Sequence, residues 1–564
     1  MLQAEHRKSI APMTVFTDSM VKVEKRMKDI LPNKATSDRL LSAYIDTNET
    51  LYRLMHVPTF REKYEQYWEG TMQSESFLPQ LLAVLAIGTR FISKSKGLGH
   101  ERMEGVHIPT ACALIRTWLN GLRGKQLVEF TTLQTEVLLL HAHRVMSLER
   151  AQESWSQLGK IVRMAMCMGL HRDPSEFEDI PPFHGELRRR LWFTILDMDL
   201  HISLVNNLPC VVREGDFTCQ PPRNLDDKDL FEDMTELPLG KPIEQTTECQ
   251  IQVYASTTLP VRLKAANMVN RIDSISDYQE VMDVGQRLDR YIEDINYVFP
   301  RHGLTDHHEK SRQWRWRVIM DMHVRRPLLA LYRPLALGDP DAPREIVRTY
   351  LRSCMVILRY LDELDPALPH YREVGDMYLQ ILKPDVIQSC FSICFYIQNI
   401  LSQNMGRGAG LDPALHLFPD SMDQMSVVSD SVMLGTPSRL INTVQKSVDL
   451  LISSQGSGDL RDIVPLYLVF QSVQPGPQPP PQEKIVREMQ ELFRECLRYT
   501  GATMDMLKQY LAPRPKQSTI PYGPTRPPYY GTGASNGGSG GGGFMGHTGN
   551  SVSKERSHNE QRME

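Results

Sequence analysis

The chain has 564 residues, of which 41% are hydrophobic and 23% are charged, enough apolar material for a large buried core. Its 64 basic and 68 acidic residues give a formal net charge of −4, which provides no electrostatic reason to expect autonomous nucleic-acid binding, since that usually needs a strongly basic surface. Residues 1–11 are polar, and no apolar run reaches the roughly 20 residues of a membrane span. We therefore expect a soluble intracellular protein without a secretory signal.

Helical periodicity recurs along the chain, whereas the alternating pattern of a β-strand does not persist. Near the N-terminus, apolar residues at 3-4-3 spacing over 20–31 predict a short amphipathic stretch of about two coiled-coil heptads. A helix is expected over 37–54. Thr59 and Glu62 then form a capping-box pattern, in which each side chain would bond a backbone amide at the start of a helix.

The next predicted helices cover 76–93, 107–122, 131–147, 151–169 and 185–206. The helix over 185–206 is apolar on almost every side, so it should be the buried centre of the fold. Trp192 on this helix and Trp155 on the helix before it are expected to fill the core. Gly169 should end its helix as a C-terminal cap.

Residues 207–245 break this pattern with prolines and acidic side chains, and they predict a connecting loop with a single helical turn. Polar residues over 406–430 predict a second long loop, and prolines over 474–482 predict a stiff linker. The remaining helices are expected at 247–272, 278–298, 310–332, 343–363, 376–402, 437–453 and 483–511.

These elements predict an all-α fold, a large multi-helix array with a disordered C-terminal tail. Residues 1–36 would form a linker with a short coiled coil, and residues 37–511 the helical body. The tail, 512–564, is rich in Pro and Tyr and then in Gly and Ser. It cannot bury enough apolar surface to offset its chain entropy.

Nine cysteines are scattered along the chain, and none forms a Cys-x-x-Cys pair. Their odd number and wide spacing argue against a disulfide framework and against a clustered thiolate metal site. We therefore expect reduced core thiols, no bound metal and no cofactor. The cysteines are Cys112, Cys167, Cys210, Cys219, Cys249, Cys354, Cys390, Cys394 and Cys496.

Two pairs of residues have metal-ligand chemistry but not its arrangement. Cys390 and Cys394 lie one helical turn apart, yet their apolar neighbours favour inert buried thiols. His141 and His143 are two residues apart, so in a helix their rings point away from each other. Neither pair predicts a metal site.

Three further polar groups were weighed as reactive centres. Asp197 and His201 lie one turn apart without a nucleophile or third ligand, which favours a structural hydrogen bond between them. The run 226–229 (Asp-Asp-Lys-Asp) resembles the DDxxD motif of helical prenyl-diphosphate enzymes, but its third aspartate comes one residue early. The arginines at 188–190 favour a solvated face or bridges to neighbouring acids. No catalytic residue is assigned, so we do not expect an enzyme.

Two blocks of sequence carry a family resemblance. The first runs from Thr132-Leu133-Gln134 to Met168-Gly169-Leu170-His171-Arg172-Asp173-Pro174, and the second from Glu186-Leu187-Arg188-Arg189-Arg190-Leu191-Trp192 to Pro222-x-Asn224-Leu225-Asp226-Asp227. In this order and spacing they resemble the middle regulatory domain of fungal zinc-cluster transcription factors, over about 37–300 with a looser continuation to about 510. The signature residues, expected to have structural roles, are Trp155, Gly159, Gly169, His171, Arg172, Arg188, Arg189, Arg190, Trp192, Asp197 and Pro209.

The resemblance implies a nuclear regulator of transcription, but the chain departs from the family in three places. Met198 stands where arginine is common, and Asn207-Leu208 precedes Pro209 where Gly-Arg is common. We expect local repacking at both. The family's six-cysteine cluster, which holds two zinc ions, has no counterpart here, because the first cysteine is Cys112. Either it lies upstream of this sequence or this is a relative without it.

DNA contact is therefore expected only indirectly, through a missing N-terminal module or a protein partner. That partner would be a second copy or a zinc-cluster relative, paired through 20–31. A small-molecule effector suits the family, although no residue here is assigned to one. Two other classes stay open, a helical scaffold without any link to DNA and, less favoured, a helical enzyme of unknown chemistry. A pocket with convergent titratable groups would favour the enzyme.

Overall fold

The computed structural model describes residues 21–91 except 73 and 75, then 105–146, 151–270, 277–300, 306–363, 371–406, 437–453, 460–474 and seven positions between 483 and 494. Within these residues every regular element is helical and no strand occurs, which confirms the all-α prediction. The predicted tail, the loop over 407–430, the proline linker from 475 and most of 483–511 lie outside the described residues.

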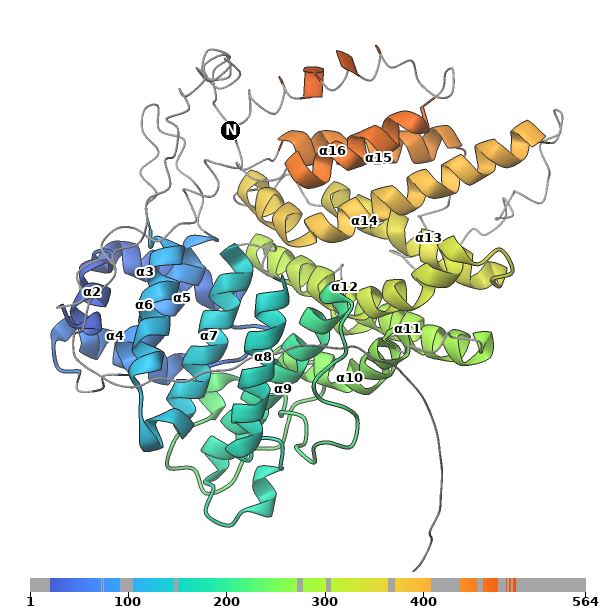
Figure 1. Cartoon of the computed structure of the whole chain (residues 1–564). Coiled ribbons are helices and arrows are strands. Elements are labelled where there is room, and N and C mark those ends of the chain that lie inside the picture. The colour runs from blue at the N-terminus through green and yellow to red at the C-terminus, as the bar shows by residue number, and fades with distance from the viewer. Residues whose placement is uncertain are drawn as a thin grey trace, which may run out of the picture. The chain divides into compact units, whose positions relative to one another are not determined.

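The first half of the chain forms helices whose apolar faces enclose one continuous core, here called the N-terminal core (Figure 1). Its most buried member is α5, where every residue from Phe77 to Gly88 is buried. A side chain at Gly88 would collide with the Leu40 carbonyl of α3, so glycine permits this close crossing. The helices are α2 (Val23–Asp29), α3 (Lys34–Thr47), α4 (Val57–Glu69), α5 (Phe77–Thr89), α6 (Ile108–Gly121), α7 (Phe130–Met146), α8 (Ala151–Cys167) and α9 (Pro182–Asn206).

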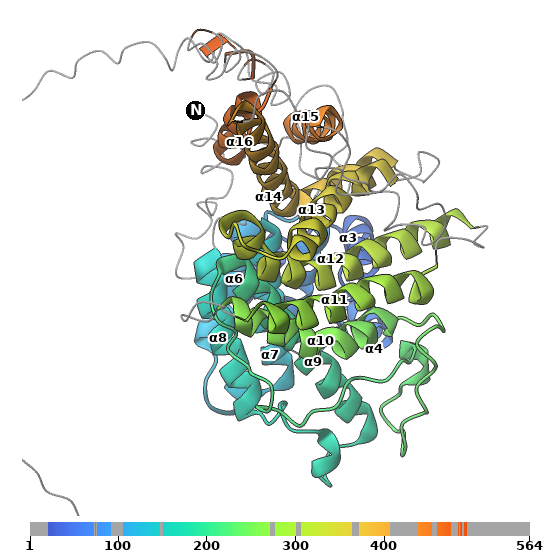
Figure 2. The same cartoon turned by 90° about the vertical axis from the view of Figure 1, so that its right-hand side faces the viewer.

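The second half encloses a separate set of buried residues, the C-terminal core. Figure 2 shows α10, α11 and α12 lying side by side, and α13 to α16 continue from them. The helices are α10 (Gln250–Val269), α11 (Tyr278–Val298), α12 (His307–Gly338), α13 (Arg344–Arg359), α14 (Tyr371–Gly406), α15 (Pro437–Ser453) and α16 (Leu460–Ser472). Short 3-10 helices are η2 (Gly124–Val128), η4 (Pro174–Glu176), η5 (Asp227–Asp229) and η6 (Tyr360–Glu363).

Helix α10 belongs to both cores. Leu259, Leu263 and Ala266 on one side join the N-terminal core. Val261 and Ala265 on another side join the C-terminal core. The two halves therefore share a helix that is buried along most of its length.

Most of the predicted helices are present, and the differences have local causes. Helix α3 ends at Thr47 and not at 54, because the chain turns there to bring Glu49 and Arg53 inside. The capping-box prediction is wrong. Helix α4 begins at Val57, so Thr59 already lies in its first turn, with its hydroxyl 2.8 Å from Nδ1 of His56.

Helix α2 also corrects the prediction of a coiled coil over 20–31. Met27 is fully buried, and Val23 and Ile30 pack against the N-terminal core. The helix contacts α5 and α6 of its own chain. Its apolar face is thus already covered within the chain, so it does not offer a seam for a partner helix. Helix α16 was not predicted at all.

Candidate functional site

Several signature residues, from Gly169 to Arg172 and from Arg188 to Arg190, lie near the start of α9, where they attach the 207–249 loop to the helical core. The sequence first turns sharply after α8. Gly169 adopts φ +75°, its N–H donates to Met166 O, and the N–H of Leu170 donates to Ala165 O. This pair of bonds is a Schellman cap, and the left-handed backbone favours glycine. Arg188 donates from Nη2 to Met168 O and so satisfies another carbonyl of the same helix end.

The residues after this turn bind the loop through both backbone and side chain. The carbonyl of His171 accepts from the amides of Thr218 and Cys219 at 2.9 and 3.1 Å. Asp173 accepts two hydrogen bonds from Arg189, at 2.9 and 2.7 Å, and one from the Gln220 amide. Burial opposes the charge of Asp173, but these donors outweigh it and hold its pKa well below the usual range.

A buried ionic group lies at the centre of the site. Asp227 of η5 accepts hydrogen bonds from Arg53, Arg190 and the Val57 amide. Arg53, Arg190 and Asp227 are each no more than 2% exposed. Burial opposes ionisation of Asp227, yet the two guanidinium groups prevail and hold its pKa at about 2. This pairing joins the segment after α3, helix α9 and the loop.

Two further carboxyl groups border this ionic group. Oε1 of Glu49 accepts from the amides of Leu54 and Met55, and Oε2 accepts from the Tyr44 hydroxyl. Complete burial nevertheless raises the pKa of Glu49 to about 7. Burial also raises the pKa of Glu186, which lies beside Arg190. The site therefore holds two kinds of carboxyl group. Asp227 stays ionised because its pKa is lowered, whereas Glu49 and Glu186 are more easily protonated because their pKa is raised.

Asp197 belongs to a second polar group, where α9 meets α10 and α12. It accepts from Arg262 Nη2 at 2.8 Å and lies 3.2 Å from Nε2 of His323. Burial opposes its charge, but Arg262 and His323 hold its pKa at about 2. The predicted hydrogen bond between Asp197 and His201 is wrong, because these neighbours on other helices occupy the carboxylate instead.

His201 contacts a different arginine. Arg326 Nη1 of α12 lies 3.4 Å from its Nδ1, and the same guanidinium binds Asp385 of α14 in bidentate fashion. The imidazole rings of His201 and His323 are stacked, with centroids 6.5 Å apart. Polar contacts thus run from α9 through α12 to α14 and connect the N-terminal core with the C-terminal core.

The two signature tryptophans differ in burial. Trp192 is fully buried, with its ring 6.1 Å from that of Phe217 in the loop. Trp155 is only partly buried, and its Nε1 donates to Pro209 O at 3.3 Å. Trp155 therefore packs against the edge of the N-terminal core and does not fill its interior, and it also covers the junction between α8 and the loop.

The remaining signature residues form hydrogen bonds with residues within about one helical turn of themselves. Gly159 is buried in α8 and its carbonyl accepts from Arg163 Nη1 at 3.0 Å. Arg172 pairs with Glu176 on the surface. Sequence reasoning missed Glu49, Arg53 and the burial of Asp227, because their partners lie far away in the chain.

The cysteines do not form a metal centre in the described part of the chain. Burial raises the pKa of the Cys210, Cys219, Cys354 and Cys394 thiols to about 12, as expected of inert core thiols. No group of three or more His, Cys, Asp or Glu side chains suited to a metal ion occurs among those residues. They therefore do not fit the zinc cluster that the family resemblance implies.

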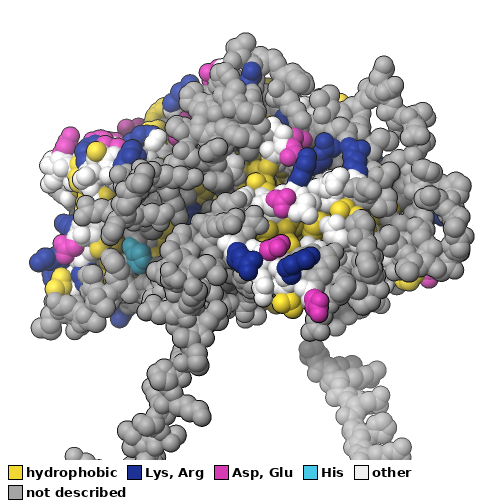
Figure 3. All heavy atoms as spheres, turned by 90° about the horizontal axis from the view of Figure 1, so that it is seen from above, with side chains coloured by type: hydrophobic (Ala, Val, Ile, Leu, Met, Phe, Trp, Pro, Cys, Tyr) yellow, Lys and Arg dark blue, Asp and Glu magenta, His cyan; other side chains and the backbone are white. Residues whose placement is uncertain are grey.

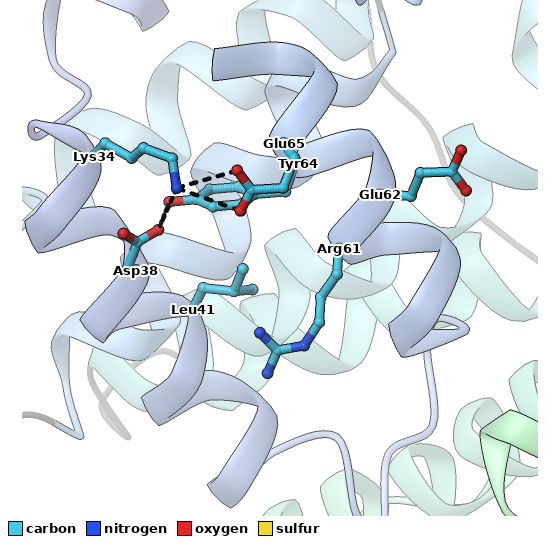
Figure 4. A pocket seen from close by; sticks show the side chains of 7 residues that line it. All are labelled: Lys34, Asp38, Leu41, Arg61, Glu62, Tyr64 and Glu65. Carbon is cyan, nitrogen blue, oxygen red and sulfur yellow. Dashed lines mark hydrogen bonds and ion pairs between the residues drawn. The ribbon is translucent and has the colours of Figure 1, made fainter. Parts of the chain in front are cut away.

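A hollow of about 460 Å³ lies between α3 and α4, beside the start of the site (Figure 4). Lys34 is held over the Tyr64 ring by Asp38 and Glu65, and the Tyr64 hydroxyl donates to Asp38 at 2.7 Å. Glu62 points away from these side chains. The hollow has no nucleophile with an adjacent base, so it does not suggest a reaction.

The sequence comparisons place this helical site in a known class. Residues 41–254 match the family model described as the fungal specific transcription factor domain. The match begins in α3, ends in α10 and includes every signature residue. No solved structure matches the chain. Residues 41–254 are therefore similar to the fungal-specific transcription factor domain, in agreement with the resemblance seen in the sequence, although the match ends at 254 and not near 300.

Curated relatives agree with this assignment. The transcription factor opdR of Penicillium oxalicum is 33% identical over 363 residues, which cover 62% of this chain and 45% of that protein. The transcription factor lepE of Aspergillus flavus is 29% identical over 54% of this chain and 36% of its own length. The Zn(2)-C6 fungal-type transcription factor pigI of Monascus ruber is 30% identical over 44% and 30%. The match spans less than half of each relative.

Proposed function

We propose that this chain is the control part of a fungal regulator of transcription, which acts in the nucleus. The observation that carries this proposal is the match of 41–254 to the fungal-specific transcription factor domain, with relatives named as transcription factors. The site supports it, because its charged groups pair with one another and hold segments together. None is arranged as a nucleophile with an adjacent base. A catalytic role is not part of the proposal.

DNA recognition is proposed to come from outside the described residues. Base readout needs side chains held against a groove by a surface that neutralises several phosphates. The arginines at 188–190 cannot supply it. Arg190 is buried, Arg189 is bound to Asp173, and Arg188 bonds a helix carbonyl. A partner protein or a zinc-binding module would provide the contact.

The test measures what the chain does when a DNA-binding module is added. A reporter with sites for an unrelated DNA-binding domain is compared with that domain alone and with its fusion to this chain. We expect the fusion to change transcription in either direction and Asp227→Ala to abolish the change. A folded fusion that leaves transcription unchanged in fungal cells would contradict the proposal.

A second measurement addresses the chain by itself. Random duplexes are selected with the purified chain at about 150 mM salt, where nonspecific contacts to phosphate are weakened. We expect no enriched sequence and no tightly bound zinc by elemental analysis. One reproducible motif would show that the chain reads DNA directly.

A further inference from the structure

A second hollow, outside the matched domain, lies between α13 and α15 and has a volume of about 200 Å³. Its lining includes three cations, Arg359, Arg439 and Lys446, and one carboxylate, Asp362. Helices α14 to α16 are uppermost in Figure 1, and the view from above shows Lys, Arg, Asp and Glu side chains among apolar ones on this side of the molecule (Figure 3). The hollow thus has an excess of positive charge.

Two of the three cations have no counter-charge in the described part of the chain. Arg439 and Lys446 are exposed on α15, and no described carboxylate pairs with either side chain. They are seven residues apart, about two helical turns, and so lie on the same side of the helix. The acid of this helix, Asp449, accepts a hydrogen bond from Gln445. Within the described part of the chain, the charges of these two side chains are therefore not neutralised.

The uncharged side chains that line the hollow limit which ligands it can bind. The hydroxyls of Thr443 and Ser447 already donate to carbonyls of α15, at 3.0 Å each. The Asn442 amide is the neutral donor that stays available. Leu358 and Leu450 supply an apolar wall, and Leu450 is 38% exposed. A ligand must bring acceptor oxygens with negative charge together with a small organic part.

We propose that this hollow binds a small phosphate monoester. Its dianion would pair with Arg439 and Lys446 through charge-assisted hydrogen bonds, and its organic part would lie against Leu450. The excess of two positive charges matches a dianion better than a single carboxylate. The space equals that of about seven water molecules, which suits a phosphate with a few carbon atoms. The inference does not rest on the proposed role in transcription.

The test is calorimetric titration of the full chain with glycerol 3-phosphate at constant ionic strength, with glycerol and sulfate as reference titrants. We expect one site per chain that prefers the phosphate ester. Arg439→Ala and Lys446→Ala should each weaken binding about tenfold, because each removes one charge-assisted contact. Arg61→Ala, an exposed arginine at the other hollow, should leave the affinity unchanged.

The variant Asp362→Asn shows whether a change in affinity comes from the hollow itself or from misfolding. It removes the only carboxylate of the hollow, so we expect affinity to rise about threefold or more, a gain that misfolding cannot produce. No binding up to about 10 mM, or equal binding by the parent and both α15 variants, would overturn the proposal. Binding only of a phosphoserine peptide would also overturn it, in favour of a phosphorylated protein partner.

Discussion

The two halves of the molecule use buried charge differently. In the N-terminal core, ionic contacts join segments far apart in the sequence, since Arg53 pairs with Asp227 across 174 residues. Among the described residues of the C-terminal core the most buried ion pair, Asp321 and Arg325, lies within one turn of α12. The pair Arg326 and Asp385, which joins two helices, is less buried. An apolar helix face can pack against many side chains, whereas a buried guanidinium must donate its hydrogen bonds to carboxylate, carbonyl or hydroxyl oxygens.

The largest expected effect tests the ionic group directly. Asp227→Ala should leave two guanidinium groups buried without their carboxylate and cost about 3–5 kcal/mol of unfolding free energy. Chemical denaturation would measure it. Asp229→Ala, two residues further on and partly exposed, should cost less than about 1 kcal/mol. Equal costs for the two variants would mean that the loop is not anchored by burial.

Apolar burial in the same half should matter about as much. Trp192→Ala leaves a large cavity beside the loop, and we expect a loss of about 3–5 kcal/mol. Trp155→Ala should cost clearly less, because that ring is only partly buried. The thermal midpoints of both variants would show the order, and a reversed order would refute the difference in burial described above.

The pH dependence of stability should come mainly from the first half. Glu49 has a pKa of about 7 in the folded chain against a usual value of 4.5, so the folded state holds its proton longer. The contribution of Glu49 to the free energy of unfolding should therefore fall by about 3 kcal/mol as pH rises from about 4.5 to 7. Glu49→Gln should make the fall in stability smaller, as measured by denaturation curves at several pH values; the fall that remains should come from Glu186 and Asp199, whose pKa burial also raises.

At acidic pH, the stability should change in the opposite direction, rising with pH. Asp197 and Asp227 keep a pKa of about 2, so their stabilisation is present above their usual value of 3.8 and is lost as pH falls towards 2. Glu49→Gln should leave this loss in place. Parallel curves for parent and variant over the whole range would contradict the role given to Glu49.

The smallest changes in stability are expected from substitutions at two signature glycines. Gly169→Ala should cost about 1–2 kcal/mol, because its φ of +75° is strained for any residue with a side chain. Gly159→Ala lies inside α8, where only the flexible end of Arg163 is close, and should stabilise by about 0.5–1 kcal/mol. Thermal unfolding would show whether each substitution raises or lowers the thermal midpoint. If both shifted the midpoint in the same direction, the position of the glycine in its helix would not determine the effect.

The helices could be predicted where apolar periodicity is long, as in α9 and α11. Helix α16 was missed, because Pro465 interrupts its pattern. The signature residues were found through the family resemblance, but not their partners. Spacing along one helix predicted His201 as the partner of Asp197, while the actual partners come from α10 and α12. Local spacing cannot reveal contacts that form only when distant helices pack.

At helix α10, the end of the family match and the end of the folded core fall at different residues. The family match ends at 254, near the start of this helix. A fragment cut there would lack Leu259 and Leu263, which complete the N-terminal core, and Arg262, which neutralises Asp197. A fragment that continues beyond Val269 keeps all three but exposes the side of α10 that faces the other core. The unit of sequence likeness is therefore shorter than the unit that can fold.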